Sequence, residues 1–239
     1  MKSVLITGAN SGIGFATAQR FLGARYRVLA HYHENKQNLE RIDNPNLHLF
    51  KANLANLEEI EKLFSECVAS TSERGVDILV NNAAVYRKED SIEDIDMIKF
   101  DESMQVNLRA PFVLTQRAMQ GMRKQKWGRI INISSISIKF GGSTTTGCYT
   151  ISKAALEAMT LTFNNVGAQS NVLVNAIRVG TTNTTLHEKN PNKNMEQIIE
   201  NIPAKRMAEA HEVADVIFFL ASEESSYISG SIVTVAGGV

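Results

Sequence analysis

The stretch Thr7-Gly8-Ala9-Asn10-Ser11-Gly12-Ile13-Gly14 follows a short apolar run, Ser3–Ile6, and precedes a segment in which apolar residues have helical spacing. Glycine at position 8 permits a tight turn, at position 12 it lets the backbone approach a pyrophosphate, and at position 14 it lets a helix pack on a strand. The helix N-terminus then offers free N–H groups and the positive end of its dipole to an anion. The stretch therefore predicts a dinucleotide-binding turn made by Gly8, Asn10, Ser11, Gly12, Ile13 and Gly14.

Short strand-like runs alternate with longer segments of helical period along the whole chain. Strands joined by helices of this length pair in parallel through crossovers. We therefore expect an α/β fold: one Rossmann-type, doubly wound parallel sheet of about seven strands, with helices on both faces, forming a single domain over residues 1–239. The expected helices cover about 13–22, 57–73, 103–125, 150–167 and 211–221. The expected strands are Ser3–Ile6, Arg27–His31, Leu47–Lys51, Ile78–Val80, Ile130–Ile133, Leu173–Ile177 and Ile232–Val235.

The segment Thr181–Pro203 breaks this alternation because it is polar, rich in asparagine and carries two of the four prolines. A stretch of this length is either a disordered insert or a lid, and lids are where active sites close. We expect a substrate lid at about 181–203, above the carboxyl ends of the strands.

The composition excludes several classes of function. The 239 residues are 44% hydrophobic and 21% charged, which is ordinary for a globular protein. Lysine plus arginine equals aspartate plus glutamate at 25 each, so no net charge attracts nucleic acid or an anionic membrane. The longest apolar run, Val216–Ala221, is too short to span a bilayer. Two cysteines, Cys67 and Cys148, suit a reducing compartment, so we expect a cytoplasmic protein.

The pattern Thr-Gly-x-x-x-Gly-Ile-Gly close to the start resembles the short-chain dehydrogenase/reductase family. Further stretches match that family in order over nearly the whole chain, and the overall pattern is nearest to its 3-oxoacyl-carrier-protein reductases. The resemblance implies hydride transfer between NAD(P)(H) and a small-to-medium carbonyl or alcohol substrate. The matching stretches are Asn81-Asn82-Ala83-Ala84, Asn107, Asn132-Ile133-Ser134-Ser135, Tyr149-x-x-x-Lys153, Asn175-Ala176-Ile177-Arg178-Val179-Gly180 with Thr184, and the tail from Glu212-Val213-Ala214 to Ala236-Gly237-Gly238.

Four residues form the expected catalytic set. Tyr149 and Lys153 are four apart and so lie one turn apart on one helix face. A lysine ammonium favours the phenolate and is expected to lower the tyrosine pKa from about 10, which would suit Tyr149 to general acid–base catalysis. Ser135 is expected to hydrogen-bond the substrate oxygen where negative charge develops. The resemblance further implies that Lys153 holds the nicotinamide ribose and that Asn107 anchors a water that links Lys153 to solvent.

Each of these residues also has an ordinary structural interpretation. Tyrosine and lysine at this spacing are common on solvated helix faces, Asn107 alone would be a hydrogen-bonding residue within a helix, and Ser135 alone would cap a strand end. Their joint occurrence in family order favours the catalytic interpretation. Of the two adjacent serines, Ser135 is the one the family pattern uses, and Ser134 is expected to be structural.

Three positions depart from the family pattern. Ala84 stands where a glycine is usual, Asn53 replaces an acidic residue after the third strand, and Val179 replaces the proline before Gly180. The last change removes the fixed φ angle of proline at the hinge of the lid. None removes a catalytic group, so these changes bear on cofactor affinity and lid rigidity.

The end of the second strand bears on the choice of nicotinamide. NAD enzymes of this fold place an acidic residue there, and the position falls on neutral Tyr32. His33, Asn35 and Lys36 can donate to a 2′-phosphate, whereas Ser11 is not the basic residue of many NADP enzymes and Glu34 would oppose a phosphate if it turned inward. The balance favours NADP(H), with NAD(H) as the alternative. The other expected cofactor contacts are Asn53, Leu54, Asn82, Ala83, Ala84, Tyr149, Lys153, Gly180, Thr182 and Thr184.

The substrate pocket is expected to be small to medium and largely apolar. No zinc-like spacing accompanies His31, His33, Glu34 or Cys148, so we expect no metal. Besides Ser135 and Tyr149, the expected lining residues are Tyr86, Ile136, Gly141, Gly142, Cys148 and Thr181.

Two functions other than an enzyme are compatible with the fold. A non-catalytic dinucleotide sensor or a structural scaffold could keep the fold, but neither needs the complete set of four residues. An acyl carrier protein as partner stays open, because Gln169-Ser170-Asn171 lacks an arginine that such reductases often carry there.

The helix after Tyr149 has more apolar surface than one sheet face can cover, and the resemblance implies that this helix and the helix with Asn107 pair between subunits. We expect a homotetramer, with a dimer as the fallback.

Overall fold

The computed structural model describes residues 1–71, 75–86, 91–184 and 194–239. Its central feature is a seven-stranded sheet in the order β3-β2-β1-β4-β5-β6-β9, in which every pair of neighbours is parallel. The strand order reverses direction between β1 and β4, which is the usual position of a ligand crevice in a doubly wound sheet. The strands are β1 (Ser3–Ile6), β2 (Arg27–Tyr32), β3 (Leu47–Lys51), β4 (Ile78–Asn81), β5 (Gly128–Ser135), β6 (Val172–Val179) and β9 (Ile232–Val235).

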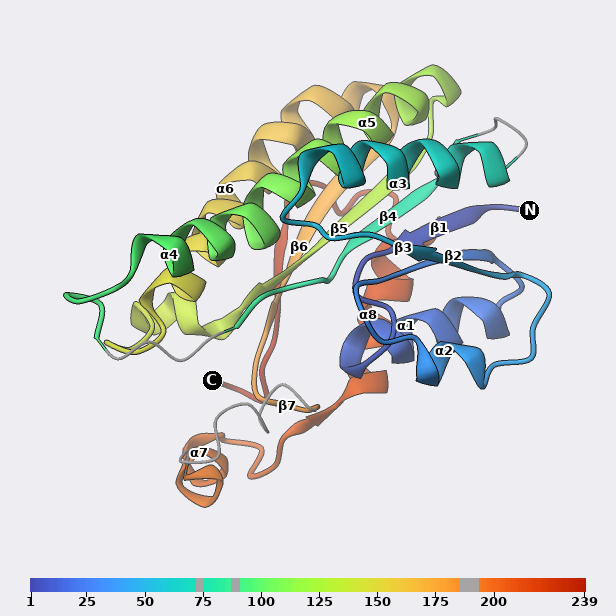
Figure 1. The fold of residues 1–239 in the computed structure, drawn as a ribbon. Coiled ribbons are helices and arrows are strands. Elements are labelled where there is room, and N and C mark those ends of the chain that lie inside the picture. The colour runs from blue at the N-terminus through green and yellow to red at the C-terminus, as the bar shows by residue number, and fades with distance from the viewer. Residues whose placement is uncertain (72–74, 87–90, 185–193) are drawn as a thin grey trace.

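Helices cover both faces of the sheet (Figure 1). One face carries α3, α5 and α6, and the other carries α1, α2 and α8. The principal helices are α1 (Gly12–Gly23), α2 (Gln37–Glu40), α3 (Leu57–Ser70), α4 (Met97–Met104), α5 (Ala110–Gln125), α6 (Gly147–Gly167) and α8 (Ala210–Leu220).

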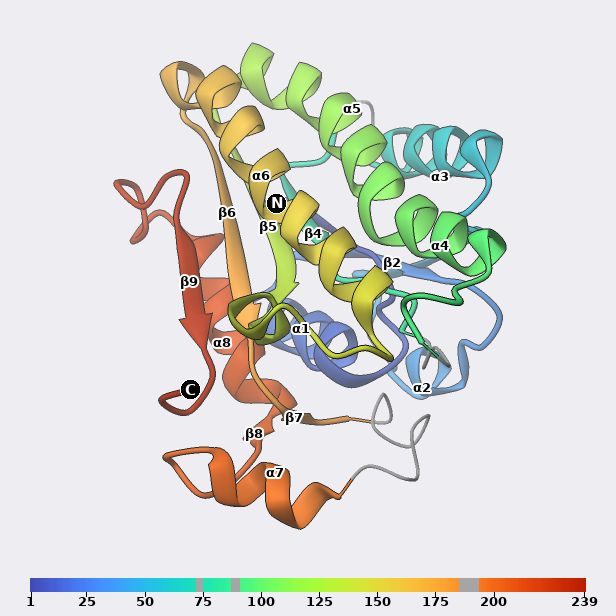
Figure 2. The ribbon, with the colours of Figure 1, turned by 90° about the vertical axis from the view of Figure 1, so that its left-hand side faces the viewer.

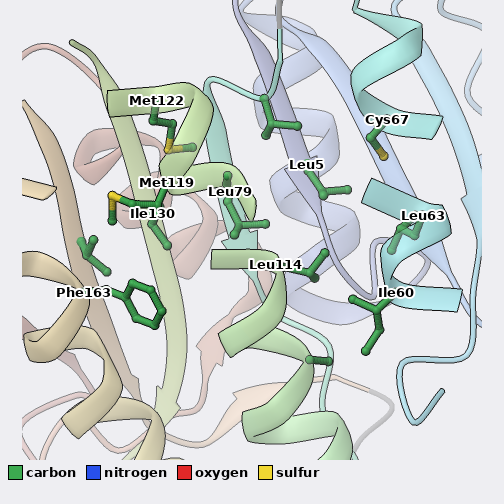
Figure 3. Packing of buried hydrophobic residues seen from close by; sticks show 14 of the residues in the cluster. Leu5, Ile60, Leu63, Cys67, Leu79, Leu114, Met119, Met122, Ile130 and Phe163 are labelled. Atoms are coloured by element: carbon green, nitrogen blue, oxygen red, sulfur yellow. The ribbon is translucent and has the colours of Figure 1, made fainter. Parts of the chain in front are cut away.

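Buried strands explain this layered arrangement. β1 and β4 are buried along their whole length, so their side chains pack against helices on both faces. Leu5 and Leu79 join the cluster beneath α3, α5 and α6, which Figure 3 shows with Leu114 and Phe163. Val4 belongs to a second cluster beneath α1 and α8.

The seven expected strands and all five expected helical segments are present. The segment expected at 103–125 begins earlier, because Asp96 caps α4 by accepting a hydrogen bond from the N–H of Ile98. It also contains a π-helical turn, Gln105–Arg109, before α5. Pro111 has no N–H to donate to the carbonyl four residues earlier, that of Asn107, and this interrupts the regular α-helical bonding there.

A small substructure lies beyond the carboxyl ends of the strands (Figure 2). β7 (Thr182–Asn183) pairs in parallel with β8 (Ala208–Glu209), and α7 (Met195–Asn201) lies between them in sequence. This substructure occupies the region of the expected lid, of which residues 185–193 lie outside the described residues. Within the described part of the chain, no helix is both long and apolar enough to cross a membrane.

Candidate active site at the carboxyl ends of the strands

The glycine-rich turn leaves the start of α1 open. Ser11 stands at the N-cap, and its side chain makes no capping hydrogen bond to the first N–H groups of α1. A Cβ at Gly14 would lie 2.2 Å from the carbonyl oxygen of Gly8, which makes glycine obligatory there. Gly8 has φ of +65° and Gly12 has φ of +52°, values that favour glycine. An open helix N-terminus behind a turn without side chains fits the pyrophosphate of a dinucleotide.

Residues after β4 form one wall of this turn. The Thr7 hydroxyl accepts hydrogen bonds from the N–H groups of Asn82 and Ala83, both at 3.0 Å. In return the Asn82 side-chain amide donates to the carbonyls of Thr7 and Gly8, at 2.9 and 3.2 Å. The structure therefore places Asn82 and Ala83 against the turn, and Ala84 follows them with partial exposure.

The other expected cofactor residues divide into two groups. Thr184 lies against the turn, because a Cβ at Gly12 would be 3.0 Å from its methyl group. Tyr32 is the last residue of β2 and is half-buried, and His33, which follows the strand, is exposed. Leu54, by contrast, belongs to the hydrophobic core, and Thr182 is 3% exposed and donates its hydroxyl to the carbonyl of Gly180.

Two asparagines expected at the cofactor site, Asn10 and Asn53, use their side-chain oxygens in hydrogen bonds within the protein. The side-chain oxygen of Asn10 accepts from the N–H groups of Asn38 and Leu39 and so holds α2 beside the turn. The side-chain oxygen of Asn53 accepts from the N–H of Ala55. These hydrogen bonds use only the side-chain oxygens, so the side-chain N–H₂ groups of Asn10 and Asn53 keep their capacity to donate.

Tyr149, Ser135 and Lys153 meet at the end of β5. Tyr149 and Lys153 lie on α6, and the Lys153 nitrogen is 5.7 Å from the centre of the Tyr149 ring. This nitrogen donates to the carbonyl of Ile133 at 2.7 Å, which fixes the lysine against β5. Ser135, the last residue of β5, hydrogen-bonds the Tyr149 side chain. The hydroxyls of Ser135 and Tyr149 can thus bind the same substrate oxygen.

Burial controls the ionisation of this group. It raises the pKa of Tyr149 to about 12, against the opposing effect of the Ser135 hydrogen bond, and Tyr86 raises it further. Burial also lowers the pKa of Lys153 to about 8. The expected lowering of the tyrosine pKa by Lys153 is therefore wrong for the protein without bound ligand, because loss of solvation outweighs it. The consequence is a protonated Tyr149, which is the acid form that carbonyl reduction needs.

Asn107 is completely buried in the π-helical turn. Its side-chain oxygen accepts from the N–H of Val85 at 2.7 Å, and its amide donates to the carbonyl of Val85 at 2.9 Å and to the hydroxyl of Ser152 at 3.0 Å. Both amide hydrogens are therefore used. The side chain ties the segment after β4 to the helix that carries Tyr149.

The two serines at the end of β5 have different surroundings. The Ser134 hydroxyl donates to Glu157 at 2.7 Å, and Arg178 donates twice to the same carboxylate, at 3.0 and 2.6 Å. Glu157 is four residues beyond Lys153 on α6 and is only 6% exposed. Ser134 is thus engaged in a structural network with Glu157, whereas Ser135 is the serine of the pair that hydrogen-bonds Tyr149.

Truncation of Glu157 is expected to destabilise the fold, because it leaves the buried Ser134 hydroxyl and the Arg178 guanidinium without their acceptor. We expect Glu157→Ala to lower the free energy of unfolding by about 1–3 kcal/mol in urea titrations. Glu66→Ala, which removes an exposed partner of Lys62 on α3, is the matched control and is expected to cost less than about 1 kcal/mol. Equal losses in the two variants would show that the buried network contributes nothing specific.

The residues expected to line the substrate pocket lie at different depths around Tyr149 and Ser135. Tyr86 packs edge-on against Tyr149, with ring centres 5.1 Å apart and planes at 87°. Ile136 and Gly142 are half-buried beyond Ser135, and Gly141 is exposed with open space beside it. Cys148 is a correction: it is completely buried in the first turn of α6, so its side chain has no surface for a substrate.

Sequence reasoning missed two residues of this region. Glu157 had a usable signal, since it continues the four-residue spacing of Tyr149 and Lys153 on one face of α6. His31 had none, because its ring bonds to backbone groups brought close only by the fold.

A parallel doubly wound sheet with an open glycine-rich turn and a tyrosine, serine and lysine at its carboxyl edge defines a dinucleotide-dependent oxidoreductase. Comparison with known proteins supports this class of enzyme. The pattern of the family described as enoyl-(acyl carrier protein) reductase matches residues 8–239. The chain is 35% identical to the 3-oxoacyl-[acyl-carrier-protein] reductase FabG of Aquifex aeolicus, with 100% of this chain and 97% of that protein covered.

Two further relatives extend this result. The chain is 32% identical to the 2-dehydro-3-deoxy-D-gluconate 5-dehydrogenase of Bacillus subtilis, covering 99% of this chain and 94% of that protein. A solved structure described as a candidate NAD(P)-dependent gluconate 5-dehydrogenase of Beutenbergia cavernae, with bound NADP, superposes with a TM-score of 0.90 at 30% identity, covering 99% of this chain and 96% of that one. The chain belongs to the short-chain dehydrogenase/reductase family, whose members are NAD(P)-dependent oxidoreductases.

Proposed function

We propose that this protein is an NADP(H)-dependent reductase of small-to-medium carbonyl compounds, in which Tyr149 is the general acid. The observation that carries the proposal is the contact of the Ser135 hydroxyl with Tyr149 one helical turn from buried Lys153. In the reverse direction the same residues would serve an alcohol dehydrogenase. The sensor alternative gains no support, because the relatives reported above are named as reductases and dehydrogenases.

Four residues of this chain have separate roles in the proposed reduction. When bound, the nicotinamide supplies the hydride. Ser135 and Tyr149 donate hydrogen bonds to the carbonyl oxygen, and Tyr149 gives up its proton as that oxygen becomes a hydroxyl. Lys153 holds positive charge near the tyrosine and retains two of its three N–H donors after bonding Ile133, which is enough to hold a ribose. Asn107 is a positioning residue that fixes α6 relative to the segment after β4.

The cofactor is proposed to lie along the carboxyl edge of the sheet. Ser11, Gly12, Ile13 and Gly14 would bind the pyrophosphate, while Asn82, Ala83, Ala84, Gly180 and Thr184 would border the rest of the molecule. A panel of ketones, aldehydes and alcohols, followed by absorbance of the reduced nicotinamide with both cofactors, tests the activity. Turnover of a carbonyl compound with NADPH supports it, and failure of every substrate with both cofactors would contradict it.

The preference for NADP(H) is a separate prediction. Tyr32, at the end of β2, carries no charge to repel a 2′-phosphate, and exposed His33 and Lys36 can donate to one. Lys36 pairs with Glu40 at 2.7 Å, an exposed contact that a phosphate can replace at little cost. We expect a higher kcat/KM with NADPH than with NADH. A preference for NADH above tenfold, about 1.4 kcal/mol, would mean that Glu34 acts as an acidic selector instead.

A homotetramer is proposed from the uncovered apolar surface of α5 and α6. Phe112, Leu161 and Val166 expose between 43% and 48% of their surface, and a groove of about 530 Å³ runs between α4, α5 and α6. β9 forms an edge of the sheet and offers a second contact surface. Light scattering is expected to give four times the chain mass of 26.4 kDa, with a dimer as the fallback. A monomer at micromolar concentration would contradict this assembly.

The location proposed is the cytoplasm. Both cysteines are free thiols buried in the fold, and burial strongly raises the pKa of Cys67, which makes that thiol unreactive. Free thiols of this kind are typical of proteins in a reducing compartment.

A further inference from the structure

His31 is a buried histidine near the cofactor site to which the reaction assigns no task. It is the fifth residue of β2 and is 2% exposed. Both nitrogens of its ring bond to backbone groups: the N–H of Gly8 donates to Nδ1 at 3.1 Å, and Nε2 lies 3.0 Å from the carbonyl oxygen of Ala52. The ring therefore stands between the glycine-rich turn and the end of β3.

These two partners fix the state of the ring. Gly8 N–H is a donor, so Nδ1 must present a lone pair, and the Ala52 carbonyl is an acceptor, so Nε2 must carry the hydrogen. Only the neutral Nε2–H tautomer satisfies both partners, because a protonated ring would point an N–H at the N–H of Gly8. Burial lowers the pKa of His31 to about 4, which agrees with a neutral ring at physiological pH.

His31 holds two successive amides of the turn. Its side chain receives the N–H of Gly8, and its backbone carbonyl receives the N–H of Ala9 at 2.8 Å. The hydrogen bond to the His31 ring is made by Gly8, whose φ of +65° marks the sharp turn of the backbone towards α1. If the ring were lost, the N–H of Gly8 would lose its partner and the turn one of its two attachments to β2.

The ring also joins this turn to the opposite side of the cofactor site. Ala52 directly precedes Asn53, and its N–H donates to the carbonyl of Tyr32 at 3.2 Å. The ends of β2 and β3 and the turn before α1 are therefore linked through one imidazole. These are the three segments to which the sequence assigns the pyrophosphate and adenosine contacts.

We propose that His31 is a positioning residue for dinucleotide binding: its imidazole bridges the glycine-rich turn and the end of β3 and sets the phosphate-binding amides against the adenosine side of the site. The proposal rests on the proposed function only in requiring that the protein bind a dinucleotide. His31 takes no part in hydride or proton transfer, so its effect falls on cofactor affinity and not on the chemical step.

Fluorescence titration with NADPH and NADH tests this directly. We expect His31→Phe, which keeps a flat ring but removes both hydrogen bonds, to raise the dissociation constant of the preferred cofactor at least about tenfold, with kcat at saturating cofactor within about threefold of wild type. His48→Phe is the matched control, since His48 lies on the adjacent strand β3 and is half-buried; its dissociation constant is expected to stay within about twofold. His31→Gln, which can both accept and donate, is expected to recover part of the affinity.

A folded His31→Phe variant that binds both cofactors like wild type would overturn the inference while leaving the proposed function intact. A wild-type protein that binds neither cofactor would overturn both. Nitrogen NMR of the histidine rings in the wild-type protein gives an independent reading even if a variant fails to fold. The neutral Nε2–H tautomer is expected for His31 at pH 7, and an Nδ1–H or doubly protonated ring would overturn the bridge.

Discussion

Replacement of Tyr149 by phenylalanine is expected to lower turnover by about two to four orders of magnitude while the protein still binds its cofactor. The substitution removes one hydroxyl and leaves the ring, so the edge-on packing against Tyr86 can persist. Loss of the proton donor leaves the developing alkoxide with only the Ser135 hydroxyl. Turnover is measured under saturating cofactor and substrate, and cofactor affinity by fluorescence.

The control for this prediction is Tyr86→Phe, which deletes a hydroxyl from the ring that contacts Tyr149. We place Tyr86 beside the substrate and assign it no proton transfer, so it should lose much less turnover than Tyr149→Phe. Activity of Tyr149→Phe within tenfold of wild type would show that another group supplies the proton.

The second large effect is expected at Lys153. This side chain is 2% exposed, and we assign it two tasks, a positive charge near Tyr149 and a contact with the nicotinamide ribose. Lys153→Met keeps an unbranched side chain of nearly the same length but removes the charge and the N–H donors. We expect turnover to fall by at least about two orders of magnitude and cofactor binding to weaken in the same variant.

Steady-state kinetics and a cofactor titration on the same preparation measure both effects. Lys139→Met, at an exposed lysine of the short segment after Ser135, provides the control for loss of a positive charge. A Lys153→Met protein with the wild-type cofactor dissociation constant would show that the ribose contact is wrong, even if its turnover is low.

Much of the fold follows from local patterns in the sequence. Strands such as Ser3–Ile6 and Ile78–Asn81 are short apolar runs, and parallel strands require helical crossovers, so order and spacing suffice to predict the sheet. The start of the helix that carries Asn107 was less predictable. It depends on the cap at Asp96 and on the missing N–H of Pro111, which act locally and do not change the apolar period.

The site was predictable where spacing along one element decides it. Tyr149 and Lys153 share a helix face, and the structure brings both to the end of β5 with Ser135. Their ionisation could not be read from spacing, because it depends on burial by distant segments, and burial reverses the expected shift of the tyrosine pKa. Cys148 shows the same limit, since its neighbour Tyr149 reaches the site while Cys148 points into the core.

The role of His31 could not be predicted from the sequence, because it also depends on contacts that only the fold creates. Its partners are backbone groups of Gly8 and Ala52, which any sequence could supply, and only the parallel register of β1, β2 and β3 brings them to one ring.

The central claim is that the protein transfers a hydride from NADPH to a carbonyl carbon with a proton from Tyr149. The most direct measurement uses NADPH with deuterium in place of both hydrogens of the transferring carbon, with the best carbonyl substrate of the panel and analysis of the alcohol by mass spectrometry. We expect one deuterium on the carbinol carbon for each NADPH oxidised by the wild-type protein, and almost no product with Tyr149→Phe. Alcohol without deuterium, or equal product from the variant, would contradict the claim.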